Sequence, residues 1–349
     1  MTTSPVTISD PVIDFDLEPF LRINDTAKKA AKLIGKEEIR FLVDAFYQLQ
    51  GDRIRTTNQL RSLKDRELNS TIIEWFAEYQ DAGEQNLAKV LGSYVQGQEL
   101  GQWLSSILGI GPLISAGLMA YIDIEKAPTV GHIWRYAGLD PSSKWISAAD
   151  ASKIVSKHVE GTTPTREEMA TISVELNRRL ENLERSAEEY KNGKPTGRIT
   201  KASLAKGISK RPYNATLKTL CFKISDQLCV RQVNNEKNYY APLFLERKAK
   251  EHAKNLAGDF ADIAERKIDT VGKTTKAYKA YKEGKLSDGE IQMRSRRWLV
   301  KLFLSHYHHV AYTLRFGENP PKPYAFSHLG HGHVVSPPNW DEEEGILIP

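Results

Sequence analysis

The sequence has little cysteine, no long apolar run and few signs of β-strands. Of its 349 residues only Cys221 and Cys229 are cysteines. They lie in a stretch with helical periodicity, so no disulfide framework is expected and a reducing cytoplasm fits best. No run of about eighteen apolar residues occurs. The acidic start, Met1–Phe15, lacks a basic segment followed by an apolar one. We therefore expect neither a membrane span nor a secretion signal.

Signatures of the readily recognised enzymes are also missing. There is no Walker loop, no dinucleotide fingerprint after a strand, no Cys-x-x-Cys pair and no His-Glu-x-x-His. A hydrophobic content of 40% is ample for a core, and the net charge of +5 permits an anionic partner without requiring one.

What is present is helical periodicity, which predicts a mainly α protein: a helical bundle with a helix-hairpin-helix element, a charged helical insertion and an irregular C-terminal tail. Six regions are expected in chain order: an irregular arm (1–24), a helical spacer (25–100), the helix-hairpin-helix region (101–145), a charged helical insertion with a basic loop (146–206), a C-terminal helical region (207–316) and a tail rich in Pro, Gly and His (317–349).

Capping residues mark several helix starts. Asn24 or Asp25 is expected to cap the first helix and Ser287 a helix that runs to Phe316, while Tyr239 to about Ile268 forms another long helix. Thr165 is expected to cap a charged helix through Lys191. This helix carries a narrow apolar stripe that suits either an exposed arm or a coiled-coil strand, made of Met169, Ile172, Leu176, Leu180 and Leu183.

The stretch "ILGIGPLISAGLMAYI" (Ile107–Ile122) raises the question of function. Gly109 and Gly111 allow a tight turn and close approach of a ligand to the backbone, Ile110 is expected to point inward, and Pro112 suits the first turn of a helix. Free N–H groups at that helix start would bind a phosphate oxygen, with Lys126 and Arg135 as the nearest cations. The alternative is a turn between two buried helices.

Leu104–Pro141, which holds this hairpin and ends in "YAGLDP", resembles the C-terminal domain of the IS110/IS116/IS902 transposases. The basic segment Gly207–Leu220 ("GISKRPYNATLKTL") resembles that family's Gly-x-x-Lys-Arg-Gly-Asn segment before a helix. The resemblance extends over about Asp25–Leu228, interrupted by the charged insertion. It implies a DNA-binding protein of a mobile element or phage that acts in recombination or transposition.

The chain departs from this family in two ways. Nothing in it offers the strands and metal-binding carboxylates of the family's N-terminal RuvC-like domain. The family's catalytic serine, which lies in a Ser-Gly pair, has only approximate counterparts here, Thr196-Gly197 and Ser203. Ser203 is the candidate catalytic residue.

A basic segment and a histidine-rich region complete the candidate sites. The cations around an expected flexible loop are suited to order on phosphates, and the alternative is a solvated loop; they are Lys194, Arg198, Lys201, Lys206, Lys210 and Arg211. In the late helix, Arg294, Arg297 and Lys301 share a face, with Arg296 and Trp298 nearby. These side chains are equally suited to contact phosphate groups or to face solvent.

Six of the nine histidines fall between His306 and His333. His306, His309, His331 and His333 could hold zinc or another divalent metal such as magnesium, with His308 and His328 as substitutes and Asp123, Glu125 or Asp140 as added carboxylates. The alternative is that these histidines pack or hydrogen-bond in a core.

The leading hypothesis is a cytoplasmic protein that grips the backbone of double-stranded DNA. A metal-dependent nuclease or transposase using Ser203 or the histidines is a second hypothesis. A protein that self-assembles through the Met169–Leu183 stripe, as a homo-oligomer, is the third.

Overall fold

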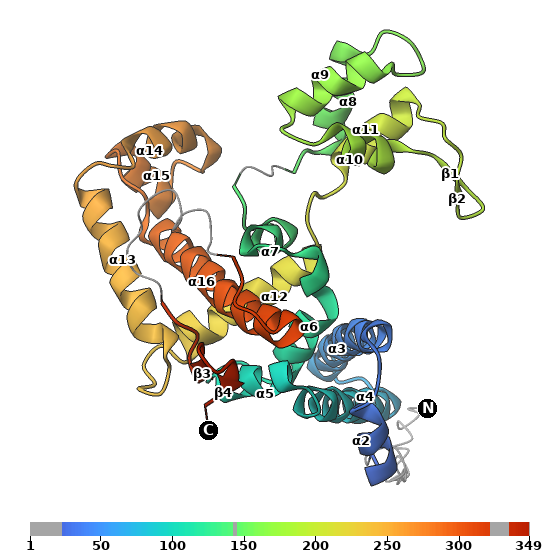
Figure 1. The fold of residues 1–349 in the computed structure, drawn as a ribbon, viewed down its shortest axis with the longest axis vertical. Helices are drawn as coiled ribbons and strands as arrows, with labels where there is room; N and C mark the ends of the chain where they lie inside the picture. Colours follow the sequence, from blue (N-terminus) through green and yellow to red (C-terminus); the bar gives the residue numbers. More distant parts are fainter. Residues whose placement is uncertain (1–22, 142–144, 322–334, 349) are drawn as a thin grey trace, which may run out of the picture. The chain divides into compact units, whose positions relative to one another are not determined.

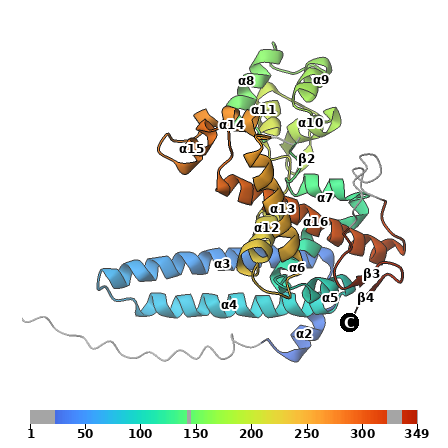
Figure 2. The same ribbon diagram turned by 90° about the vertical axis from the view of Figure 1, so that its left-hand side faces the viewer.

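The computed structural model describes residues 23–141, 145–321 and 335–348. The protein is mainly α, as predicted. It divides into two compact units (Figures 1 and 2): unit 1 runs to Ser106 and includes Gly111–Tyr121, and unit 2 comprises Ile107–Ile110 and the chain from Ile122 onward. Most of the expected N-terminal arm and part of the expected tail lie outside the described residues.

Unit 1 is a bundle built on a long helical hairpin. Its helices are α2 (Asp25–Ala31), α3 (Lys36–Asp65), α4 (Thr71–Gln96), α5 (Glu99–Ser106) and α6 (Pro112–Tyr121). Helices α3 and α4 run side by side (Figure 2), and α6 packs against both. The core repeats apolar residues at helical spacing, as Ile39, Val43 and Phe46 do on α3. Asn24, not Asp25, caps α2, because its Oδ1 accepts from Ala27 N at 2.8 Å.

Unit 2 contains the remaining elements. The insertion holds α8 (Ala148–His158), α9 (Arg166–Glu175), α10 (Leu180–Ala187), β1 (Tyr190–Lys191), β2 (Lys194–Pro195) and α11 (Lys201–Ser209). The other helices are η1 (Ile124–Lys126), α7 (Val130–Tyr136), α12 (Ala215–Asp226), the π-helical η2 (Gln227–Arg231), α13 (Tyr240–Leu256), α14 (Ala261–Lys267), η3 (Ile268–Thr270), α15 (Lys276–Lys282) and α16 (Asp288–Phe316). β3 (Trp340–Asp341) pairs antiparallel with β4 (Ile346–Leu347), as β1 does with β2.

The charged insertion has a hydrophobic core of its own. Helices α8 to α11 lie together (Figure 1), and residues from all four contribute to one buried cluster: Ala151, Val155, Val159, Met169, Ile172, Leu183, Ala187, Leu204 and Ile208. The prediction of one helix from Thr165 to Lys191 is wrong. Thr165 does cap a helix, but α9 ends at Glu175, and Asn177 adopts a φ of +49° before α10 starts. The apolar stripe is therefore used inside the insertion rather than in a coiled coil.

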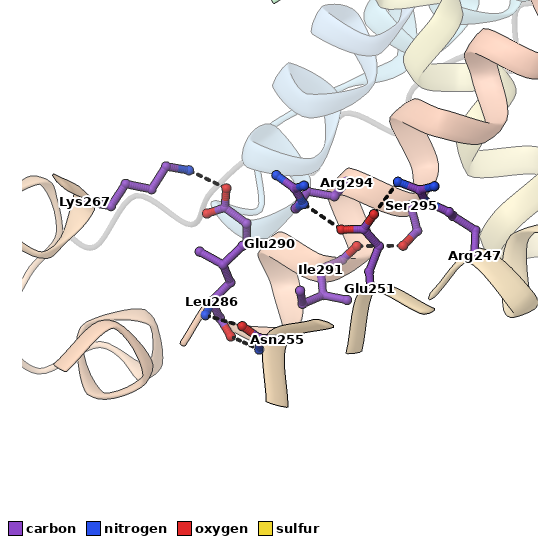
Figure 3. Close-up of polar contacts among 9 residues, drawn as sticks. All are labelled: Arg247, Glu251, Asn255, Lys267, Leu286, Glu290, Ile291, Arg294 and Ser295. Atoms are coloured by element: carbon purple, nitrogen blue, oxygen red, sulfur yellow. Dashed lines mark hydrogen bonds and ion pairs between the residues drawn. The ribbon is translucent and has the colours of Figure 1, made fainter. Parts of the chain in front are cut away.

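Helices α13 and α16 are joined by an ion pair with a buried carboxylate. The Glu251 carboxylate of α13, whose side chain is 2% exposed, accepts from Arg247 and, at 2.8 Å, from Arg294 of α16 (Figure 3). Asn255 exchanges two hydrogen bonds with the backbone of Leu286, at 2.8 and 2.9 Å. The expected helix Tyr239–Ile268 is divided, because Gly258 adopts a φ of +89° between α13 and α14. Helix α16 and its Ser287 cap are as predicted.

None of the helices in the described part of the chain combines the length and the apolar character that a membrane span requires.

Candidate nucleic-acid interface

The Gly109–Pro112 segment forms a tight connection between α5 and α6. Ile110 N donates to Ile107 O at 3.0 Å, and the Ile110 side chain is 3% exposed, which is the inward orientation predicted for it. Gly109 has a φ of +90°, a conformation that L side chains rarely adopt. Gly109 is therefore needed for the turn itself.

Gly111 has a different role. Its φ is not in the positive range, the residue is exposed, and a Cβ built on it would meet nothing within 4 Å. Pro112 begins α6 and is also exposed, and Ser115 N donates to Gly111 O at 3.0 Å. The N–H groups of the first helical turn have no partner within a helix. A ligand oxygen therefore has room to approach the backbone at Gly111.

The two cations nearest to this turn in the sequence differ in their surroundings. Lys126 is exposed and forms an ion pair with Asp123 at 3.1 Å, a contact that exposed groups exchange readily for another anion. Arg135 is exposed in the last turn of α7.

The two motif segments of the sequence meet in unit 2. Asn214, which caps α12, donates from its backbone N to Tyr136 O and from Nδ2 to Tyr136 Oη, each at 2.9 Å. Gly138 has a φ of +66°, and a Cβ there would lie 2.8 Å from Cγ of Tyr213. The structure thus places "YAGLDP" against the start of the helix that follows "GISKRPYN", with the charged insertion emerging between them.

The expected flexible basic loop is wrong, because the segment is folded. Asn192 and Gly193 have φ values of +52° and +76° and close the β1–β2 hairpin as an Asn-Gly turn. Lys194 follows on β2, and Lys201 and Lys206 lie on α11.

Three of the six cations of this segment already have partners in the protein. Lys201 Nζ donates to Val159 O at 2.6 Å, Lys210 Nζ donates to Ser186 O at 2.8 Å, and the guanidinium of Arg211 lies 5.9 Å from the centre of the Trp145 ring. The other three, Lys194, Arg198 and Lys206, are exposed. They are the cations best placed to meet a phosphate.

The basic face expected on α16 is divided between two environments. Arg294 is held by Glu251, and its guanidinium lies 4.4 Å from the centre of the Phe260 ring. Arg297 remains exposed, and Lys301 Nζ lies 5.1 Å from the centre of the Trp134 ring. Burial lowers the pKa of Lys301.

Sequence reasoning missed a cavity of about 430 Å³ in unit 2. It is lined by the Gly138–Pro141 turn, by α12 residues including Lys218 and Phe222, and by α16 residues including Arg296 and Arg297. We call it the α12–α16 cavity. The segments that line it lie far apart in the sequence. Of its lining residues, sequence analysis singles out as candidate binding side chains only two cations of the late helix, Arg296 and Arg297, and the carboxylate Asp140.

Two histidines of α16, His306 and His308, make hydrogen bonds in the core. His306 is 2% exposed, and its two ring nitrogens lie 2.8 Å from Tyr240 Oη and from Val335 O. His308 Nε2 lies 2.8 Å from Ala127 O. Burial lowers the pKa of His306 to about 4 and also lowers the pKa values of His308 and His309.

The metal hypothesis stays a prediction. His328, His331 and His333 lie outside the described residues. Within residues 23–141, 145–321 and 335–348, no group of three or more His, Cys, Asp or Glu side chains is placed to hold a metal ion. The carboxylates considered for such a site have other neighbours, since Glu125 pairs with Arg315 and Asp123 with Lys126.

Ser203 takes part in a helix cap. Its Oγ accepts from Thr200 N at 2.9 Å and donates to Thr200 O at 3.1 Å, while its own N–H donates to Thr200 Oγ1. This reciprocal arrangement starts α11. A catalytic role for Ser203 also stays a prediction, and the other candidate, Thr196-Gly197, lies in the turn after β2.

Comparison with known proteins agrees with the motif. No curated protein and no solved structure matches the chain. Residues 101–157, however, match the model of the family described as Transposase IS116/IS110/IS902 family. The matched segment includes the Gly109–Pro112 turn, α6, α7 and the Gly138–Pro141 turn, so this part of the protein is similar to that transposase family.

Proposed function

We propose that this protein binds the phosphate backbone of double-stranded DNA and acts in the recombination or transposition of a mobile element. The observation that carries the proposal is the exposed Gly111 at the start of α6, with open space where a side chain would be, inside the segment that matches a transposase family. A glycine at that place lets a phosphate oxygen reach the helix N–H groups. Such a contact holds DNA without reading its sequence.

The second contact in this proposal is the group of exposed cations Lys194, Arg198 and Lys206. The fold of the insertion fixes the backbone that carries them, so they are presented to DNA without first ordering a loop. Lys201 and Lys210 serve as internal controls, because their ammonium groups are engaged with backbone carbonyls.

Gly111→Leu tests the turn. The variant keeps an allowed backbone and space for its side chain in the free protein, but the side chain blocks a phosphate. We expect the affinity for duplex DNA to fall about tenfold or more, the cost of one charged hydrogen bond, for all sequences alike. Gly51→Leu, at an exposed and open helix position, is the matched control. Circular dichroism and melting temperature show that both variants fold.

Wild-type affinity in a folded Gly111→Leu protein would remove the turn from the interface. A salt series tests the cations separately. Changing Lys194, Arg198 and Lys206 to Gln should reduce the slope of log affinity against log salt by roughly 2 to 3, since each phosphate contact contributes about 0.9. An unchanged slope would show that these side chains do not meet phosphates.

A further inference from the structure

The α12–α16 cavity has the size and lining of a site for a small ligand. Its volume of about 430 Å³ lies within the range of roughly 300–1,000 Å³ found for such sites. Apolar walls come from Leu139, Cys221, Met293 and Val300. A few polar groups complete the lining, which is the usual composition of a specific pocket.

Phe222 is an aromatic surface at this cavity. It is 52% exposed although it lies beside a hollow, and the Arg296 guanidinium lies 4.7 Å from the centre of its ring. Arg296 is fixed there, because its Nε donates to Ser225 Oγ at 3.0 Å and its guanidinium lies 3.5 Å from the Asp226 carboxylate. An exposed ring backed by a fixed cation suits the stacking of a flat, electron-rich ring.

The charge of the lining is positive. Lys218, Arg296 and Arg297 contribute three cations, and Asp140 contributes the one carboxylate, which leaves a balance of +2. The Asp226 carboxylate behind Arg296 is shared with Arg231, at 2.8 Å, so it neutralises Arg296 only in part. Lys218 and Arg297 are exposed and can reach a phosphate.

We propose that the α12–α16 cavity holds a single unpaired nucleotide, with its base against Phe222 and its phosphate between Lys218 and Arg297. A flat ring joined to an anion matches the exposed aromatic and the two exposed cations, of which Lys218 has its Nζ 4.1 Å from the centre of the Tyr213 ring. Within the proposed function, which this inference extends, the nucleotide would be one displaced from the stack of the bound DNA. The cavity would then distinguish distorted DNA from a regular duplex.

The first experiment measures binding of three duplexes of the same sequence by fluorescence anisotropy: one fully paired, one with a single unpaired adenine nucleotide, and one with an abasic residue at that place. Wild-type protein should prefer the unpaired base by about 5- to 150-fold, the worth of stacking one base on an aromatic ring. Phe222→Leu keeps an apolar side chain against Arg296 but should lose the preference. Phe41→Leu, at another exposed phenylalanine, should retain it.

The second experiment needs no duplex binding. Deoxyadenosine monophosphate and inorganic phosphate are each titrated into the full chain by calorimetry. The nucleotide should bind more tightly than phosphate, Phe222→Leu should remove this difference, and Lys218→Gln should weaken both ligands.

The outcomes separate the two proposals. Duplex binding without a preference for the unpaired base, or with a preference that Phe222→Leu retains, overturns the cavity assignment and leaves DNA binding intact. Nucleotide binding that depends on Phe222, in a protein that binds no duplex, overturns the proposed function and supports the cavity. Nucleotide and phosphate that bind equally, or do not bind, overturn the base site.

Discussion

Acid should destabilise this protein through His306, and the structure gives the size of the effect. Because a carbonyl oxygen can only accept, Nε2 of the neutral ring carries the proton donated to Val335 O, and Nδ1 accepts from the Tyr240 hydroxyl. A second proton on Nδ1 would require the Tyr240 hydroxyl to turn and accept, and it would place a charge among buried groups. Burial accordingly lowers the pKa of His306 to about 4.

The direction in which the free energy of unfolding changes with pH follows from proton binding. The unfolded chain takes up the proton near the ordinary histidine pKa of 6.5, but the folded chain takes it up only near 4. Between these values the unfolded state binds more protons, so the free energy of unfolding falls as the pH falls. At about 1.4 kcal/mol per pKa unit, His306 alone accounts for a loss of roughly 3 kcal/mol between pH 7.5 and pH 4.

The assay is urea unfolding followed by circular dichroism at steps from pH 7.5 to pH 4. His306→Gln, which keeps a donor but cannot titrate, should lose roughly 3 kcal/mol less than wild type over this range. His132→Gln, at an exposed histidine, is the matched control for the loss of a histidine side chain. Parallel curves for wild type and His306→Gln would refute the reasoning, since His306 would then have the same pKa in both states.

Three further predictions concern stability and reactivity. Glu251→Gln leaves Arg247 and Arg294 without their buried anion, so the free energy of unfolding, measured by chemical denaturation, should fall by about 3–5 kcal/mol. Glu246→Gln removes one partner of an exposed pair and should lower it by at most about 1 kcal/mol. Equal losses in the two variants would contradict the role of burial. Gly207→Ala places a Cβ 2.9 Å from the backbone of α10 and should lower the free energy of unfolding by about 1–3 kcal/mol. Gly51→Ala, in open space, should raise it by about 0.5–1 kcal/mol. An unchanged stability of Gly207→Ala would show that α10 and α11 can separate freely. Burial raises the pKa of both cysteine thiols to about 12. Because Cys229 does not line the α12–α16 cavity, a disulfide reagent should modify Cys229 only as fast as the protein unfolds, and rapid labelling of native Cys229 would argue against its burial.

Local signals in the sequence were sufficient for much of the helical structure. Thr165 is followed three residues later by Glu168, and the structure has this capping box. Ser287 likewise begins α16. The sequence did not predict the break at Asn177, because its φ of +49° arises where two short helices turn to bury one core.

The candidate site was predictable where it depends on neighbouring residues. The glycines of the Gly109–Pro112 turn and its buried Ile110 follow from local geometry. The partners of Lys201 and Lys210 do not, because the carbonyls that hold them belong to residues 42 and 24 positions away. Arg296 finds Ser225 across a separation of 71 residues, so the cavity that it lines was beyond any periodic pattern.

The charged insertion leaves the chain and returns to it at adjoining points. Trp145 Nε1 donates to Ser209 O at 2.9 Å, next to the pairing of Tyr136 with Asn214. A segment whose ends lie together and which has its own core can be exchanged, shortened or removed during evolution without displacing the helices on either side of it. The same property gives the experimenter a natural place to graft a reporter or another binding module into this protein.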